Sequence, residues 1–229
     1  MTSPGKFIVI EGTDGSGKTE QFRRLVLRLP QGFPFKTADF PQYDEPSSYF
    51  VTEYLNGRYG AANDVSAKKA SLFYALDRMD ASLKKMDRWL ASGQAIIGNR
   101  WVGSSMAHQG GKIENKKERI AFFKWLYELE FEICGVPKPD VSIVLHMPAA
   151  MAQELVDKKQ SRNYISGKAR DLHEGDLAHL EHAEKVYLEM AELFPDHFTV
   201  VECAPGGKLL SIPEVHEKVW EIARKTLGI

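Results

Sequence analysis

The sequence predicts an α/β fold, in which helices cover both faces of a five-stranded parallel β-sheet. Short apolar runs rich in β-branched residues alternate along the chain with longer segments whose apolar residues recur at helical spacing. Strands separated in this way pair in parallel, because a parallel pair needs a long crossover and a helix is the usual one. Such sheets bind ligands beyond the carboxyl ends of their strands, so we expect the functional residues there.

The first strand is predicted at residues 7–10, a continuous apolar run typical of a strand that is buried on both faces. Apolar residues then recur from Phe22 to Leu29 as one helical stripe, and Pro30 and Gly32 end this helix. The chain therefore begins with a strand, a glycine-rich loop and a helix.

The same reasoning predicts the remaining elements. Further strands are expected at residues 35–40, 95–97, 141–146 and 198–202. Further helices are expected at residues 47–55, 66–92, 116–133, 149 to about 159, 177–193 and 213–227. Gly93, Pro148 and Ser211 have the residue types that end, begin and cap helices. Without a repeat or a linker, residues 1–229 are expected to form one domain.

The composition is that of a globular protein, with 43% hydrophobic and 27% charged residues in 229. The formal net charge of −1 supplies no basic field, so we expect no nucleic-acid partner. No apolar run is long enough for a signal peptide or a membrane span, so we expect a cytoplasmic protein without membrane association. Cys134 and Cys203 lie far apart without CxxC spacing, which indicates neither a disulfide nor a metal site.

The strongest motif, Gly-Thr-Asp-Gly-Ser-Gly-Lys-Thr at residues 12–19, matches G-x-x-x-x-G-K-[ST] between a predicted strand and a predicted helix. Its glycines let backbone N–H groups turn towards phosphate oxygens, which the helix N-terminus also attracts. Lys18 is expected to neutralise the β- and γ-phosphates, and the Thr19 hydroxyl to bind Mg²⁺. The residues assigned to the nucleotide are Gly12, Asp14, Gly15, Ser16, Gly17, Lys18 and Thr19. The motif alone does not distinguish a kinase from a GTPase switch or a motor.

Four further motifs follow in order: Phe-Pro-Gln-Tyr at 40–43, Leu-Asp-Arg at 76–78, Asn-Arg-Trp at 99–101 and Arg-Asp-Leu-His-Glu at 170–174. Together with the phosphate loop they resemble the thymidylate kinase family along nearly the whole chain. The resemblance implies a three-layer P-loop NTPase fold and transfer of the γ-phosphate of ATP to dTMP, with Mg²⁺, to give dTDP. It also implies a homodimer, for which residues 68–89 are the candidate surface.

The resemblance also implies an acceptor site. Tyr74 would stack on the thymine ring opposite Phe40, and Tyr43 would exclude a 2′-hydroxyl. Arg78 and Arg100 would bind the acceptor phosphate, because a planar guanidinium meets phosphate oxygens in pairs. The other implied substrate contacts are Asp14 at the 3′-hydroxyl, Ser105 and Gln109 at the base edge, and His173, which matches an aromatic position near the acceptor.

The residues themselves leave two simpler interpretations open. An aromatic residue at helical spacing, such as Tyr74, is more often part of a core than a ligand platform. Arg78 also fits a surface arm that pairs with Asp77 or Asp80. His108 and the other histidines show no metal-ligand spacing and are interpreted as ordinary polar residues.

A basic segment at about residues 157–173 is expected to act as a lid over the bound triphosphate. The phosphate loop has Gly15 and Ser16 after Asp14 and therefore lacks the arginine that some thymidylate kinases carry there. The charge for the transferred group would come from Arg162, Lys168 and Arg170, unless these are merely solvated. The predicted catalytic residues are Lys18, Arg100, Arg162 and Arg170.

The sequence departs from the family at Asn99, where most members have aspartate before the arginine. Asparagine brings no negative charge, so its hold on Mg²⁺ or a metal-bound water should be weaker. Asp14 and Glu174 could compensate, and with Thr19 they form the predicted metal site. The alternatives are a kinase of another deoxynucleoside monophosphate and a weakly active ATP-binding protein.

Overall fold

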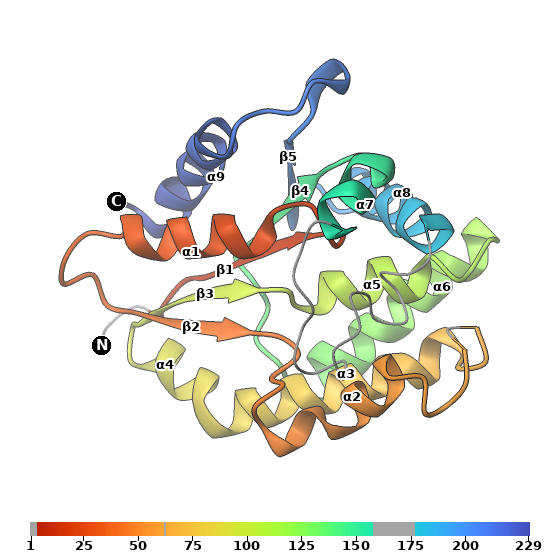
Figure 1. Cartoon of the computed structure of the whole chain (residues 1–229). Coiled ribbons are helices and arrows are strands. Elements are labelled where there is room, and N and C mark those ends of the chain that lie inside the picture. The colour runs from red at the N-terminus through yellow and green to blue at the C-terminus, as the bar shows by residue number, and fades with distance from the viewer. Residues whose placement is uncertain (1–3, 62, 158–176) are drawn as a thin grey trace.

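The computed structural model describes residues 4–61, 63–157 and 177–229. Its centre is a sheet of the strands β1 (Phe7–Gly12), β2 (Phe35–Asp39), β3 (Ala95–Asn99), β4 (Val141–His146) and β5 (Phe198–Glu202). The strands lie in the order β2-β3-β1-β4-β5, and every neighbouring pair is parallel. Helices lie on both sides of this sheet, so the predicted fold class is confirmed (Figure 1).

The central strand β1 is buried on both faces. Phe7 and Val9 join one apolar cluster, whereas Ile8 and Ile10 join a second cluster on the opposite face. Each of these four side chains is at most 1% exposed. This burial on both faces accounts for the uninterrupted apolar run.

Two sets of helices form the outer layers. α1 (Lys18–Arg28) and α9 (Ile212–Leu227) pack together over the cluster that contains Ile8. On the other face α4 (Asp87–Ala91), α5 (Val102–Gly110) and α8 (Leu177–Leu193) contact the sheet. The remaining helices pack on these or on each other: α2 (Tyr49–Leu55), α3 (Ala67–Ala81), α6 (Lys116–Tyr127) and α7 (Ala149–Asp157).

Apart from shifts of one or two residues at their ends, the predicted elements agree with the structure except in three places. Residues 158 and 159, at the end of the helix predicted from 149, lie outside the described residues. The helices predicted at 66–92 and 116–133 change to π-helical turns at Ser82–Met86 and Glu128–Ile133. Helix α5 was not among the predicted elements, because its glycines and serines are weak helix formers that obscure the pattern.

The predicted helix ends are confirmed at Ser211 and Gly93. Ser211 forms a reciprocal capping box with Glu214 at the start of α9. Gly93 adopts a φ of 80° directly after the α4 segment. Cys134 and Cys203 are free thiols. Among the helices of the described ranges, none is long and apolar enough to cross a membrane.

Candidate active site

The phosphate loop joins β1 to α1, as its motif requires. Gly15 has a φ of 85°, and a Cβ there would lie 2.1 Å from the backbone oxygen of Ala152. Gly17 has a φ of 89° and precedes the first residue of α1. Only glycine suits both positions, since one lacks room for a side chain and both require the left-handed conformation.

Most polar side chains of the loop are buried, and two of its hydroxyls have no hydrogen-bond partner among the described residues. Lys18 is 6% exposed, and its Nζ donates to the backbone oxygen of Thr13 at 2.6 Å. The hydroxyl oxygens of Thr13 and Ser16 are buried and have no hydrogen-bond partner in the described part of the chain. Buried hydroxyls are normally hydrogen-bonded, so these two fit a ligand with acceptor oxygens such as a phosphate.

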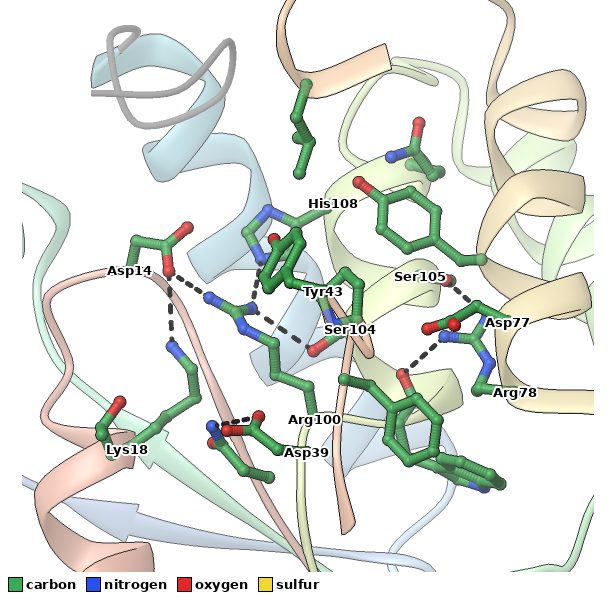
Figure 2. Close-up of a pocket in the computed structure, with 18 of the residues that line it drawn as sticks. Asp14, Lys18, Asp39, Tyr43, Asp77, Arg78, Arg100, Ser104, Ser105 and His108 are labelled. Carbon is green, nitrogen blue, oxygen red and sulfur yellow. Dashed lines mark hydrogen bonds and ion pairs between the residues drawn. The ribbon is translucent and has the colours of Figure 1, made fainter. Parts of the chain in front are cut away.

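A cavity of about 570 Å³ opens beside this loop and beyond the ends of β2 and β3 (Figure 2). It brings together twelve predicted site residues: Asp14, Gly15, Gly17, Lys18, Thr19, Phe40, Tyr43, Tyr74, Arg78, Arg100, Ser105 and Gln109. The other lining residues are Glu20, Asp39, Pro41, Leu55, Asp77, Asn99, Trp101, Ser104 and His108. Gly12 lies at the end of β1, and the buried Ser16 lies within the loop.

Arg100 lies at the centre of the cavity, directly after β3. Its guanidinium pairs with the carboxylate of Asp14, which also lies 3.7 Å from Nζ of Lys18 (Figure 2). Burial opposes the charge of Arg100, but the Asp14 carboxylate, together with Tyr187, Tyr43 and Glu11, outweighs this effect and raises the pKa of the guanidinium above its usual range. The backbone φ of Arg100 is 63°, a conformation that costs a non-glycine residue about 1–3 kcal/mol and occurs often at functional sites.

His108 was interpreted from sequence as an ordinary polar residue, but it lines the cavity. Its Nε2 lies 3.4 Å from the Arg100 guanidinium, and its Nδ1 lies 3.2 Å from Nε2 of His179. Burial first, and then the charge of Arg100, lower the pKa of His108 well below its ordinary value. A neutral His108 can accept a hydrogen bond from Arg100. No sequence motif indicated this contact.

Arg78 is 2% exposed, so the interpretation as a surface arm is wrong. Two of its N–H groups donate to the carboxylate of the fully buried Glu130, and a third donates to Ser105 Oγ at 2.9 Å. The sequence gave no indication of Glu130, which lies 52 residues away on the second π-helical turn.

The expected partners of Arg78 have other roles. Asp77 accepts hydrogen bonds from the backbone N–H of Gln42 at 2.9 Å and from Ser47 Oγ at 2.6 Å. Asp80 pairs with Lys84 at 2.9 Å. Asp77 therefore fastens the 40–47 loop to α3, which holds Tyr43 at the cavity.

The aromatic residues of the cavity lie on two of its sides. Phe40 packs against Trp101 with ring centroids 4.7 Å apart, and both are almost fully buried. Tyr74 lies edge-on to Tyr54 at 6.4 Å and lines the cavity with part of its surface exposed. Tyr74 therefore faces the cavity and also packs against the small core cluster that contains Tyr54.

The buried Glu11 fixes the start of α5. One of its oxygens accepts hydrogen bonds from the backbone N–H groups of Trp101 at 2.9 Å and Ser104 at 3.1 Å. The other accepts from Ser104 Oγ at 2.6 Å and from Tyr187 at 3.1 Å. A carboxylate at a helix N-terminus is favourable, and this one ties α5 to β1 so that the helix carries its side chains into the cavity.

At the end of β3, Asn99 and Asp39 are hydrogen-bonded. Nδ2 of Asn99 donates to Oδ1 of Asp39 at 2.8 Å, and the two residues are register partners on neighbouring strands. Burial raises the pKa of the Asp39 carboxyl, while the hydrogen bond from Asn99 and the charge of Arg100 counteract it.

Four predicted site residues, Arg162, Arg170, His173 and Glu174, lie outside the described residues, as does the predicted lid apart from Asp157. Within the described ranges no group of three or more His, Cys, Asp or Glu residues could hold a metal ion by itself.

A family model described as thymidylate kinase matches residues 10–218 of this chain. The chain belongs to the thymidylate kinase family. The family resemblance inferred from the five motifs is therefore confirmed, and the predicted activity, phosphorylation of dTMP by ATP, is that of this family.

Individual members of the family agree with this assignment. The thymidylate kinase of Mycobacterium tuberculosis is 31% identical over 191 residues, which cover 80% of this chain and 85% of that protein. The probable thymidylate kinase of Pyrococcus abyssi is 26% identical over 225 residues, which cover 97% of this chain and 98% of the other. The structure of the Candida albicans thymidylate kinase matches the fold with a TM-score of 0.72 at 24% identity, over 99% of this chain and 95% of that one.

Proposed function

We propose that the protein transfers the γ-phosphate of ATP to dTMP and forms dTDP. The observation that carries this proposal is the carboxylate of Asp14, which contacts both Lys18 of the phosphate loop and Arg100 of the acceptor side. Lys18, assigned to the donor phosphates, and Arg100, assigned to the acceptor phosphate, thus lie beside the same carboxylate in a single cavity. Phosphoryl transfer between two polyanions depends mainly on such alignment and charge neutralisation.

The contacts favour different roles for the two arginines. Arg100 lies beside Lys18, so we assign it to the acceptor phosphate, whose oxygens would take over from Asp14 as its partner. Arg78 already has its charge compensated by Glu130 and lies against Ser105, so it suits the base end of dTMP better than its phosphate. This assignment replaces the expectation that both arginines bind the phosphate.

No general base is required for the reaction. The second pKa of a phosphate monoester is about 6, so near neutral pH the acceptor already carries an unprotonated oxygen. Lys18 and Arg100 would then hold donor and acceptor in line and reduce the repulsion between them. Mg²⁺, when bound, supplies further positive charge to the donor phosphates, and the Thr19 hydroxyl at the mouth of the loop is the residue that fits it.

The predicted basic lid remains part of the proposal, on sequence grounds alone. Replacing Arg162, Lys168 and Arg170 together with alanine should lower kcat by at least about a hundredfold, because closure supplies charge and excludes water. The urea unfolding midpoint should stay the same. An unchanged kcat would contradict the lid assignment.

The choice of acceptor is tested by a coupled assay of ADP release. ATP and Mg²⁺ are combined with dTMP, dUMP, UMP, dCMP, dGMP or AMP at equal concentrations, and kcat/KM is compared. We expect selectivity for dTMP, with UMP rejected because Tyr43 lies in the cavity where a 2′-hydroxyl would need room.

The main alternative is a kinase with a wider or different choice of deoxynucleotide. The related Candida albicans enzyme is described as having broad substrate specificity. Equal kcat/KM values for several deoxynucleotides would favour this alternative. ATP binding without turnover on any acceptor would favour the weakly active ATP-binding protein.

A further inference from the structure

The end of β3 lacks the acidic residue that the family resemblance leads us to expect, but the neighbouring strand supplies one. Asn99 ends β3, and Asp39 ends β2 as its register partner. Both residues line the cavity together with Thr19, the predicted ligand of Mg²⁺. The negative charge at this edge of the sheet is therefore retained, displaced by one strand.

The hydrogen bond between the two residues fixes the orientation of the Asn99 amide. An amide must turn its N–H group towards a carboxylate, so Nδ2 of Asn99 donates to Asp39 and Oδ1 points elsewhere. Asn99 is only 6% exposed, and its Oδ1 is buried with no hydrogen-bond partner in the described part of the chain. A buried acceptor of this kind fits a donor that is brought by a ligand.

The charges around Asp39 belong to the phosphate end of the cavity. Burial raises the pKa of the Asp39 carboxyl, whereas the charges of Arg100 and Lys18 act in the opposite direction and favour its ionised form. Figure 2 shows the Asp39 carboxylate between these two side chains. The Asp39–Asn99 pair thus carries one negative charge where the donor and acceptor phosphates are expected to meet.

Asp14 and Glu174 are the other candidates for the missing charge. Asp14 is held by Arg100 and lies near Lys18, so its charge is already compensated. Glu174 lies outside the described residues. Mg²⁺ keeps several of its waters in nucleotide sites, and such waters donate hydrogen bonds that need acceptors.

We propose that Asp39 replaces the missing β3 aspartate and, together with Oδ1 of Asn99, accepts hydrogen bonds from water bound to the Mg²⁺ of the ATP complex. Asp39 is thereby a positioning residue for the metal. This inference depends on the proposed ATP-dependent reaction, but it concerns the metal only and makes no claim about the acceptor.

The test measures binding of Mn²⁺, a spectroscopic substitute for Mg²⁺, to the enzyme–ATP complex in the absence of acceptor. The variants are Asp39→Asn, Asn99→Asp and the charge-swapped Asp39→Asn/Asn99→Asp. Free Mn²⁺ is followed by electron paramagnetic resonance, and metal-free ATP binding is measured by calorimetry. Asp196→Asn, an exposed substitution with the same change of charge, is the matched control.

Asp39→Asn should weaken Mn²⁺ binding at least about tenfold, the usual effect of losing an outer-shell partner of a metal. Metal-free ATP binding and the Asp196→Asn control should not change. The charge-swapped variant should recover affinity to within about threefold, because it restores one carboxylate and one amide in reversed positions. Asn99→Asp should bind Mn²⁺ at least as tightly as the wild type.

Mn²⁺ binding by Asp39→Asn that equals the wild type would overturn the proposal, and so would a charge-swapped variant that binds no better than Asp39→Asn. If Asp39→Asn does not fold, the charge-swapped variant decides alone: wild-type affinity supports the proposal, and a loss of tenfold or more overturns it. Failure here is distinct from failure of the proposed function, since the acceptor assay uses the wild-type protein and this measurement uses no acceptor.

Discussion

Glu130 compensates the charge of Arg78 and so changes the role that Arg78 can have in the cavity. Its carboxylate is fully buried and holds the guanidinium of Arg78, which is itself 2% exposed. The motif containing Arg78 is visible in the sequence, whereas this partner is not. The same is true of the contacts of Asp39 with Asn99 and of His108 with His179, because contacts between distant segments leave no local pattern.

Removal of the Glu130 carboxylate should destabilise the protein strongly. Glu130→Ala leaves the Arg78 charge buried without its partner, which costs about 3–5 kcal/mol in the free energy of unfolding. The double variant Arg78→Met/Glu130→Ala should lose less than the sum of the single variants. Urea denaturation gives the free energy of unfolding of Glu130→Ala, Arg78→Met and the double variant. Strictly additive losses would show that the pair is not coupled.

The stability of the fold should depend on pH through His146 at the end of β4. Burial lowers the pKa of His146, but hydrogen bonds to Glu202 at 2.6 Å and Glu184 at 2.8 Å outweigh it and raise the pKa above 6.5. The folded state therefore binds this proton more tightly than the unfolded state. The protonated His146 makes its full contribution to the free energy of unfolding below pH 6.5. It is lost as the pH rises through the raised pKa.

The variant His146→Gln isolates this effect. The free energy of unfolding of the wild type relative to His146→Gln should be constant below pH 6.5 and should fall as the pH rises above it. Urea denaturation at several pH values measures the difference. A difference that stays constant or grows with pH would contradict the assignment of the proton to His146.

The regular elements were the most predictable part of the molecule. β4, β5 and α8 have the predicted ends, because short apolar runs and helical spacing are patterns of neighbouring residues in the sequence. α5 was missed, since Glu11 of β1 and not its own composition stabilises its start. The two π-helical turns were also missed, and one of them carries Glu130 into the cavity region.

The capping box at Ser211 gives a prediction for α9. Ser211→Ala removes the hydrogen bond to the backbone N–H of Glu214 and should lower the free energy of unfolding by about 1 kcal/mol. Ser211→Asp keeps an acceptor at this position and should retain most of the stability. Equal losses for the two variants in urea denaturation would exclude a capping role.

At the scale of the whole molecule, the parallel sheet explains why separate motifs form one site. The phosphate loop, Asp39 and the 99–101 motif lie at the ends of β1, β2 and β3, and the carboxyl ends of these parallel strands lie at one edge of the sheet. The motifs and their order thus predicted twelve of the residues that line the cavity, whereas Asp39 and His108 were not predicted. The pairing of charges in the cavity is visible only in the structure. Asp14 lies between Lys18 and Arg100, and Glu130 pairs with Arg78.

The predicted homodimer can be tested on the surface of residues 68–89. Leu76 and Leu83 are exposed there by 46% and 69%, at helical spacing on consecutive segments of this helix. If the homodimer forms through this surface, Leu76→Glu/Leu83→Glu should halve the mass seen by light scattering. Leu27→Glu, 70% exposed on α1, should leave the mass unchanged. A wild-type mass of one chain would contradict the proposal.

The most direct test of the proposed reaction follows the phosphate itself. ATP labelled at its γ-phosphate is mixed with the protein, Mg²⁺ and dTMP, and the products are separated by chromatography. We predict that the label appears in dTDP, only when dTMP is present, and that Lys18→Ala abolishes the transfer. Label that stays in ATP or appears only as inorganic phosphate, in a protein that still binds ATP, would contradict the account.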